Sequence, residues 1–137
     1  MVLVVPSCMQ FRGGRIVLAL DALVFAGFGA LYWIIPAQMA AKVGVALTNT
    51  AAVIDVQGLY GGLELGLGCF LGYCALAASR TRLGLTAGAF ALCGIALSRV
   101  VAIARFGLPD SSVAMLVGLD ALGAILNVMF LLRMRTT

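Results

Sequence analysis

The sequence predicts an all-α fold, an integral membrane four-helix bundle whose N-terminus and C-terminus both lie in the cytoplasm. Hydrophobic residues make up 64% of the 137 residues and charged residues only 10%, which leaves too little polar surface to cover a soluble core. Four stretches are long and apolar enough to cross a bilayer, which takes ~20 residues per helix. The basic residues flank these stretches instead of gathering on one face, so the net charge of +4 indicates membrane orientation and not nucleic-acid binding.

The expected spans follow one another along a single transmembrane domain, residues 1–137, with only short polar links between them. Pro36 ends the first span because proline cannot continue the hydrogen-bond ladder of a helix. The longest link follows it, and its 36–45 part is expected to form a short helix at the outer interface. The tight turn that begins at Ser79 makes the second and third spans antiparallel neighbours. We place the four spans at about 16–35, 54–78, 83–104 and 112–132.

The distribution of basic residues predicts the orientation of the chain. Six arginines lie on the side of the two termini, and only Lys42 and Arg105 lie on the other side. The positive-inside rule therefore puts both termini in the cytoplasm, and we expect a multi-pass protein of the bacterial inner membrane. Tyr32 and Trp33, at the outer end of the first span, are expected to belong to an aromatic interface belt. The six arginines are Arg12, Arg15, Arg80, Arg82, Arg133 and Arg135.

Glycines repeat every four residues on the second span, at Gly58, Gly62 and Gly66. Small residues at this spacing let two helices approach closely in a membrane, where little hydrophobic force drives helices together. Two partners fit such a seam: a second copy of the chain, as in a dimer, or another helix of the same chain. Because four helices must pack, we expect the contact within one chain.

The few polar residues within the spans form a candidate site. Helical spacing places Gln57, Tyr60 and Glu64 on one stripe of the second span. At ~1.5 Å rise per residue, Glu64 lies about 15 Å, Asp120 about 12 Å and Arg99 about 8 Å below the outer ends of their spans. These side chains therefore share a depth in the outer half of the membrane.

A charge inside a membrane is costly unless it is paired, so the three ionisable residues are expected to meet inside the bundle. Arg99 is the only mid-span cation, and it can neutralise either Glu64 or Asp120. We expect the other acid to be hydrogen-bonded, in either its ionised or its protonated form. The cluster is either a functional site or a structural contact that holds the helices in one register. Asp21 lies deeper, about 20 Å below the outer end of its span, and is expected to form a separate site.

No catalytic constellation accompanies this cluster. The chain has no histidine, and its four cysteines do not have the spacing of metal ligands. It has neither a Gly-x-Ser-x-Gly nucleophile motif nor a phosphate-binding loop. We therefore expect no catalytic residue, no metal and no cofactor, and an enzyme is the less favoured class.

A specific motif lies in the second span, where residues 55–68 combine an acidic residue, Tyr-Gly-Gly and Gly-Leu-Gly in Asp-Val-Gln-Gly-Leu-Tyr-Gly-Gly-Leu-Glu-Leu-Gly-Leu-Gly. With it the chain resembles, from about Arg15 to Leu132, the small bacterial four-helix membrane proteins grouped as domain of unknown function 4345. The resemblance implies the fold and the membrane location, and it implies no activity. The family more often has Glu at the position of Asp120. Supporting residues elsewhere are Phe28-Gly29, Pro36, Ser98-Arg99, Gly107 and Asp120.

For function, the sequence favours a non-enzymatic protein with very short loops. Such a protein meets partners through its lipid-facing sides or its interior, as an accessory subunit of a larger membrane complex, as a dimer, or as a lipid-binding module. The alternative is a transporter or membrane enzyme for a small lipophile such as a quinone, an isoprenoid or a sterol-like molecule. Internal repeats and broken helices, which are usual in transporters, are not evident. The expected outward-facing pocket is lined by Gln57, Tyr60, Glu64, Arg99 and Asp120.

Overall fold

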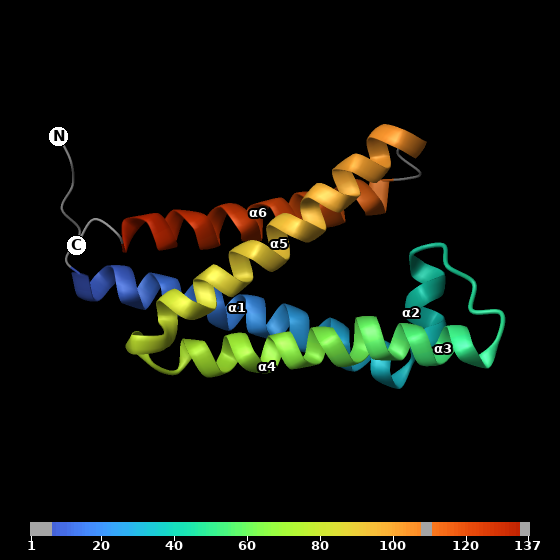
Figure 1. The fold of residues 1–137 in the computed structure, drawn as a ribbon, viewed down its shortest axis with the longest axis horizontal. Helices are drawn as coiled ribbons and strands as arrows, with labels where there is room; N and C mark the ends of the chain where they lie inside the picture. Colours follow the sequence, from blue (N-terminus) through green and yellow to red (C-terminus); the bar gives the residue numbers. More distant parts are fainter. Residues whose placement is uncertain (1–6, 108–110, 135–137) are drawn as a thin grey trace.

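The computed structural model describes residues 7–107 and 111–134, and within these residues every regular element is a helix (Figure 1). The fold is therefore all-α, as the sequence predicts. The short helix expected after Pro36 is present, and the elements from Thr50 to Ala75 follow one another without a break. In chain order the elements are α1 (Ser7–Ile34), α2 (Pro36–Lys42), α3 (Thr50–Val56), the π-helix η1 (Gln57–Leu63), α4 (Glu64–Ala75), α5 (Ala78–Phe106) and α6 (Ser111–Arg133).

Among the described residues, three helices are long and apolar enough to cross a membrane. They are α1 over Phe11–Ile34, α5 over its full length, and α6 over Val113–Arg133. The 29 residues of α5 correspond to ~43 Å of helix, more than the ~30 Å of a bilayer's hydrocarbon core. Many of their large apolar side chains are exposed, which is the surface that a lipid environment requires. These helices indicate a membrane protein.

The long helices form two pairs that meet at one end and separate at the other (Figure 1). In the first pair α1 packs along η1 and α4, and in the second α5 packs along α6. Contacts of α1 with both α5 and α6 join the two pairs. Figure 1 shows α5 running diagonally away from α4, so that the end of α5 lies far from α2 and α3. The two pairs therefore form a wedge.

The hydrophobic core fills the narrow end of this wedge. Three fully buried leucines from three different helices belong to this core: Leu18 on α1, Leu71 on α4 and Leu85 on α5. The buried residues of α5 all lie between Thr81 and Leu92, and the described second half of that helix has none. The core therefore closes one end of the molecule and leaves space between the pairs at the other.

Arginine side chains complete the narrow end. The Nε atom of Arg15 donates to the carbonyl oxygen of Ala75 at 2.7 Å, and its guanidinium also donates to the carbonyl of Leu76 at 3.3 Å. The last carbonyls of a helix have no partner within the helix, so this arginine satisfies the end of α4. The guanidinium of Arg80 lies 3.8 Å from the ring centroid of Tyr73, which makes a cation–π contact.

Glycines bring α1 and α4 into close contact. A Cβ atom built on Gly68 would lie 2.5 Å from the backbone nitrogen of Ala26, and one built on Gly29 would lie 2.4 Å from that of Leu65. No side chain fits at either position, because a backbone atom cannot move aside as the end of a flexible side chain can. Gly68 and Gly29 therefore set the distance between the two helices.

The glycines of the predicted seam, Gly58, Gly62 and Gly66, do not pack against another helix of the same chain. Cβ atoms built on Gly58 and Gly66 meet nothing within 4 Å, and one built on Gly62 approaches only the carbonyl of Gln57, at 3.8 Å. The expectation of an intrachain contact there is wrong. Its physical reason is the π-helix η1, whose wider turn changes which residues share a face.

Two boundaries also differ from the expected spans. α1 continues through Gly13 and Gly14 instead of beginning after them. These glycines pack closely, because a Cβ on Gly13 would lie 2.4 Å from the Phe130 ring and one on Gly14 would lie 2.9 Å from the Met134 side chain. Tertiary contact therefore overrides their low helix propensity. At the narrow end, α5 begins at Ala78, so the predicted turn residues lie in its first turn.

Candidate functional site

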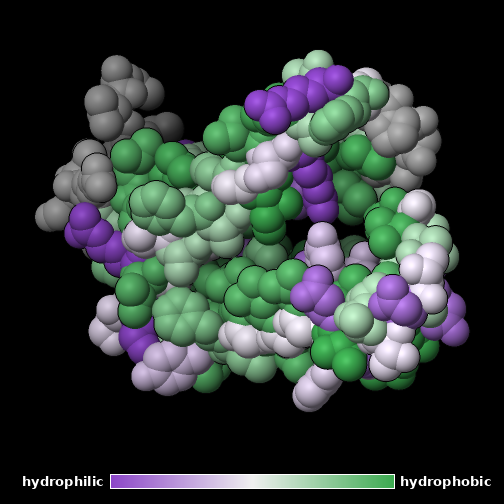
Figure 2. Space-filling view, turned by 45° about the vertical axis from the view of Figure 1, so that its right-hand side comes forward, coloured by the Kyte–Doolittle hydropathy of each residue, from purple (hydrophilic) through white to green (hydrophobic). Residues whose placement is uncertain are grey.

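A cavity of about 490 Å³ lies between the two helix pairs, on the wide side of the core. This volume lies within the ~300–1,000 Å³ typical of small-molecule sites. Figure 2 shows the molecule hollowed on this side, with hydrophilic groups reaching into a largely hydrophobic surrounding. Phe25 and Leu92 belong both to the core and to the cavity wall, so the core forms its floor. The apolar wall includes Phe25, Phe28, Leu92, Ile95, Leu116 and Leu119.

The polar residues of the cavity come from five different elements. The sequence places five residues in a pocket, and four of them line this one: Tyr60 on η1, Glu64 on α4, Arg99 on α5 and Asp120 on α6. Tyr32 on α1 joins them. The wedge between the helix pairs is what brings these distant residues together.

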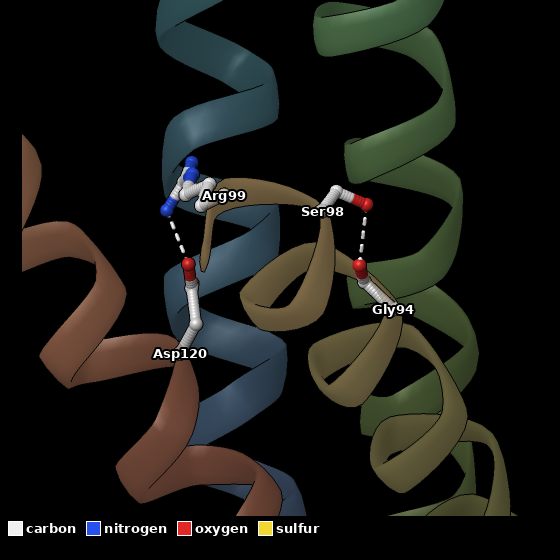
Figure 3. Close-up of polar contacts among 4 residues, drawn as sticks. All are labelled: Gly94, Ser98, Arg99 and Asp120. Atoms are coloured by element: carbon white, nitrogen blue, oxygen red, sulfur yellow. Dashed lines mark hydrogen bonds and ion pairs between the residues drawn. The ribbon is translucent and has the colours of Figure 1, made fainter. Parts of the chain in front are cut away.

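Arg99 and Asp120 connect α5 to α6 at the cavity wall. One terminal nitrogen of Arg99 donates to Asp120 Oδ2, and the two form an ion pair (Figure 3). The side chain of Arg99 is 36% exposed and that of Asp120 is 16% exposed, so the pair is only partly shielded. Ser98 turns the other way and donates to the carbonyl of Gly94 on its own helix, at 2.6 Å. Of the two neighbouring residues Ser98 and Arg99, it is therefore Arg99 that faces the cavity.

Glu64 lies on the other helix pair and makes no hydrogen bond or ion pair among the described residues. The expectation that the second acid is hydrogen-bonded is wrong here. α5 diverges from α4 towards the wide end, so the guanidinium of Arg99 is held by its neighbour Asp120 on α6 instead. Glu64 is half-buried, and its carboxyl group faces the cavity without a protein partner in the described part of the chain.

Two tyrosines stack next to Glu64. The ring centroids of Tyr32 and Tyr60 lie 5.3 Å apart at an interplanar angle of 30°. Tyr32 is only 8% exposed, so it is part of the cavity wall and not of the interface belt that the sequence predicts. Trp33 is 58% exposed, as a belt residue would be. The pair places the faces and edges of two aromatic rings within the candidate site.

Gln57 is the one predicted pocket residue that does not line the cavity. Its side-chain nitrogen donates to the carbonyl oxygen of Trp33 at 2.8 Å, which ties the start of η1 to the end of α1. A π-helix is rare, and short π-helical segments occur frequently at functional sites. Here it contributes Tyr60 to the cavity and leads directly into Glu64. The glycine-rich run of η1 contains Gly58, Gly61 and Gly62, and from the sequence we attributed Gly58 and Gly62 to helix packing.

Asp21 forms a separate polar contact, as the sequence predicts by its depth. Its Oδ2 atom accepts a hydrogen bond of 2.7 Å from the side-chain nitrogen of Asn127 on α6, which also donates to the carbonyl of Gly123 at 2.9 Å. Asn127 is fully buried, and its Oδ1 atom has no hydrogen-bond partner in the described residues. The sequence alone does not indicate this pairing of Asn127 with Asp21 on α1, because it depends on how α1 and α6 face each other.

The family model described as domain of unknown function (DUF4345) matches residues 14–131, which include every polar residue of the cavity. This match confirms the resemblance seen in the sequence. No curated protein and no solved structure matches the chain. The chain belongs to the DUF4345 family.

Proposed function

We propose that this DUF4345 protein is a binding module for a small lipophilic molecule that carries a polar group. The observation that supports it is the cavity between the helix pairs, whose wall is mainly apolar and whose ionisable residues gather on facing helices. Small-molecule sites commonly have this composition, with apolar side chains for most of the ligand surface and a few polar groups that fix its orientation. The apolar wall would hold the body of the ligand, and Glu64, Arg99 and Asp120 would hold its polar group.

The membrane topology belongs to the same proposal. The continuous helical segment 50–75 has the length of a span, and with α1, α5 and α6 it would make a four-span bundle. Arg12, Arg15, Arg80, Arg82 and Arg133 all belong to the narrow end, so the positive-inside rule would place that end and both termini in the cytoplasm. The cavity would then open towards the outer side of the bacterial inner membrane.

Among the functions that the sequence leaves open, binding is the one that the cavity favours. An accessory subunit needs a contact surface and no internal cavity. A transporter usually has internal repeats and broken helices, and the helices of the described residues are continuous apart from η1. An enzyme needs a nucleophile, a metal or a proton shuttle in place, and Glu64 beside an arginine–aspartate pair does not form such a constellation. We therefore propose a non-enzymatic role.

Site-specific photo-crosslinking tests this proposal in native membranes. A photoreactive amino acid replaces Leu116, which lines the cavity, and in a control replaces Leu122, which lies on the same helix, is 53% exposed and does not line the cavity. After irradiation, mass spectrometry of the purified protein should detect one defined small-molecule adduct at position 116. Position 122 should give only a mixture of bulk phospholipid adducts. The same bulk adducts at both positions would contradict the proposal.

A further inference from the structure

The charges that face the cavity do not balance. Arg99 and Asp120 neutralise each other as an ion pair, which leaves the carboxyl group of Glu64 without an ion-pair partner among the described residues. The other described residues that line the cavity, including those from α2, α3 and the loop between them, carry no charge. With Glu64 ionised, the cavity therefore carries one net negative charge. Electrostatic interactions act over longer distances in such an apolar surrounding than in water.

Aromatic rings lie beside the same carboxyl group. Tyr32 and Tyr60 are stacked at the cavity wall, and Phe25 and Phe28 line it further along α1. The faces of aromatic rings attract cations, because the ring quadrupole is negative at the face. An unpaired carboxylate next to a group of aromatic rings is a combination that suits a cation with apolar substituents.

We propose that the ligand of this cavity is a monovalent lipophilic cation, an amine or onium compound with apolar substituents, whose charge is neutralised by Glu64. This inference rests on the proposed binding function and specifies its ligand class. The apolar substituents pack against the phenylalanine and leucine side chains, and the positive centre lies between Glu64 and the tyrosine pair. Arg99 is held away from the cation by its ion pair with Asp120.

The same charges disfavour a lipophilic anion. An anion that approached Arg99 would compete with Asp120 for the guanidinium and would face a second carboxylate at Glu64. The cavity would then hold three negative groups and one positive group. Like charges in an apolar cavity raise the free energy of binding.

The affinity for the cation should also depend on pH. A proton competes with the cation for the Glu64 carboxylate, so binding should weaken as the pH falls. The titratable or charged groups that face Glu64 are Tyr32 on α1, Tyr60 on η1, Arg99 on α5 and Asp120 on α6. Asp120 is engaged by Arg99 in an ion pair, so the carboxyl group of Glu64 is the acid of this cavity on which a proton and the cation compete directly.

Equilibrium dialysis of the full-length protein in an uncharged detergent tests the inference, with protein-free micelles as the blank. Tetraphenylphosphonium and tetraphenylborate are the probes, since they have nearly the same size and shape and opposite charge. The wild-type protein should bind tetraphenylphosphonium about tenfold or more tightly than tetraphenylborate, and only the cation should bind more weakly at pH 5 than at pH 8. These measurements need no variant, so they do not depend on whether a substitution folds.

Variants then assign the effect to Glu64. Glu64→Gln should lower the affinity for tetraphenylphosphonium about tenfold and remove its pH dependence, whereas Glu64→Asp should keep the preference for the cation. Asp55→Asn is the matched control: Asp55 is an exposed acid of the same helical segment that does not line the cavity, and its loss should change affinity less than about twofold.

The outcomes separate the two proposals. Equal binding of both ions, tighter binding of tetraphenylborate, or unchanged cation binding by Glu64→Gln would overturn the cation inference. A specific adduct at position 116 together with any of these results would leave the binding function intact and assign a different ligand class. Absence of binding by either ion, combined with only bulk lipid adducts at position 116, would overturn both.

Discussion

The side-chain nitrogen of Asn127 on α6 donates a hydrogen bond of 2.7 Å to the carboxyl group of Asp21 on α1, which joins the two helix pairs. Asp21 lies one helical turn before Phe25, so this contact lies just beneath the floor of the cavity. Asn127 is fully buried, and Gly88 on α5 leaves room for its amide: a Cβ built on Gly88 would lie 2.7 Å from Asn127 Oδ1. Three helices are therefore fitted around one amide.

Replacing Asn127 by leucine should destabilise the protein, because the carboxyl group of Asp21 then loses its only hydrogen-bond donor among the described residues. A polar group left unpaired in a buried position costs ~1–3 kcal/mol. The double variant Asp21→Leu/Asn127→Leu should recover part of this loss, since both polar groups are removed together. Thermal unfolding in detergent measures all the variants. A double variant whose loss equals the sum of the losses of Asp21→Leu and Asn127→Leu would show that the two residues are not coupled.

The second prediction compares two glycines two residues apart. Gly68→Ala should destabilise the protein by ~1–3 kcal/mol, because the new Cβ would overlap the backbone of α1 near Ala26. Gly66→Ala places its Cβ in open space and should be neutral or stabilising, since alanine favours a helix over glycine by ~1 kcal/mol. Thermal unfolding of the two variants under identical conditions measures the difference. Equal stabilities would contradict the close packing of α1 against α4.

The third prediction concerns the ion pair of the cavity. Arg99→Leu leaves Asp120 without its counter-charge and should cost ~1–3 kcal/mol at neutral pH. This is less than the ~3–5 kcal/mol for a fully buried pair, because Arg99 is 36% exposed. At low pH the carboxyl groups of Asp120 and Glu64 take up protons, so the difference between variant and wild type should shrink. Unfolding at pH 4 and pH 7.5 tests this, and an equal difference at both values would contradict it.

Removing the two acids should have unequal effects. Asp120→Asn deprives Arg99 of the carboxylate that it contacts and should be the more destabilising change. Glu64→Gln should change stability little, because Glu64 makes no hydrogen bond or ion pair among the described residues. The unfolding temperatures of the two variants provide the comparison. A larger loss for Glu64→Gln would show that Glu64 has a structural role that the ion pair does not explain.

The fifth prediction concerns orientation. In a variant whose native cysteines are replaced, single cysteines are introduced at Thr48, in the link between α2 and α3, and at Ser79, in the first turn of α5. Because most of the basic residues lie at the narrow end, a membrane-impermeant thiol reagent added to intact spheroplasts should label position 48 only. Labelling of position 79 alone would reverse the orientation and make the cavity open towards the cytoplasm.

Much of this fold is predictable because composition and span length act over whole segments. The all-α class and three of the helices expected in the membrane follow from runs of apolar residues, which few other structures can accommodate. That Glu64, Arg99 and Asp120 line one cavity follows from their depths and from the cost of charge in a membrane, although only Arg99 and Asp120 pair directly. Depth can be counted from the ends of a helix without knowing how the helix is rotated.

Rotation is what the sequence does not reveal. The rotation of a helix about its own axis decides which glycines contact a neighbouring helix. The π-helix η1 changes this rotation between Gly58 and Gly68. The partner of Asp21 depends on how α1 and α6 face each other, which no periodicity determines. Likewise, the choice of Asp120 over Glu64 as the partner of Arg99 follows from the divergence of the two helix pairs.

Native mass spectrometry of the protein released from its own membranes tests the central claim, that the cavity between the helix pairs holds a ligand, most directly. Leu116→Trp should fill the cavity from α6, whereas Leu122→Trp places the same side chain on the exposed face of that helix. A small lipophile should be bound at a ratio of one to one to the wild-type protein and to Leu122→Trp, and it should be absent from Leu116→Trp. Equal retention by both variants, with both folded, would contradict it.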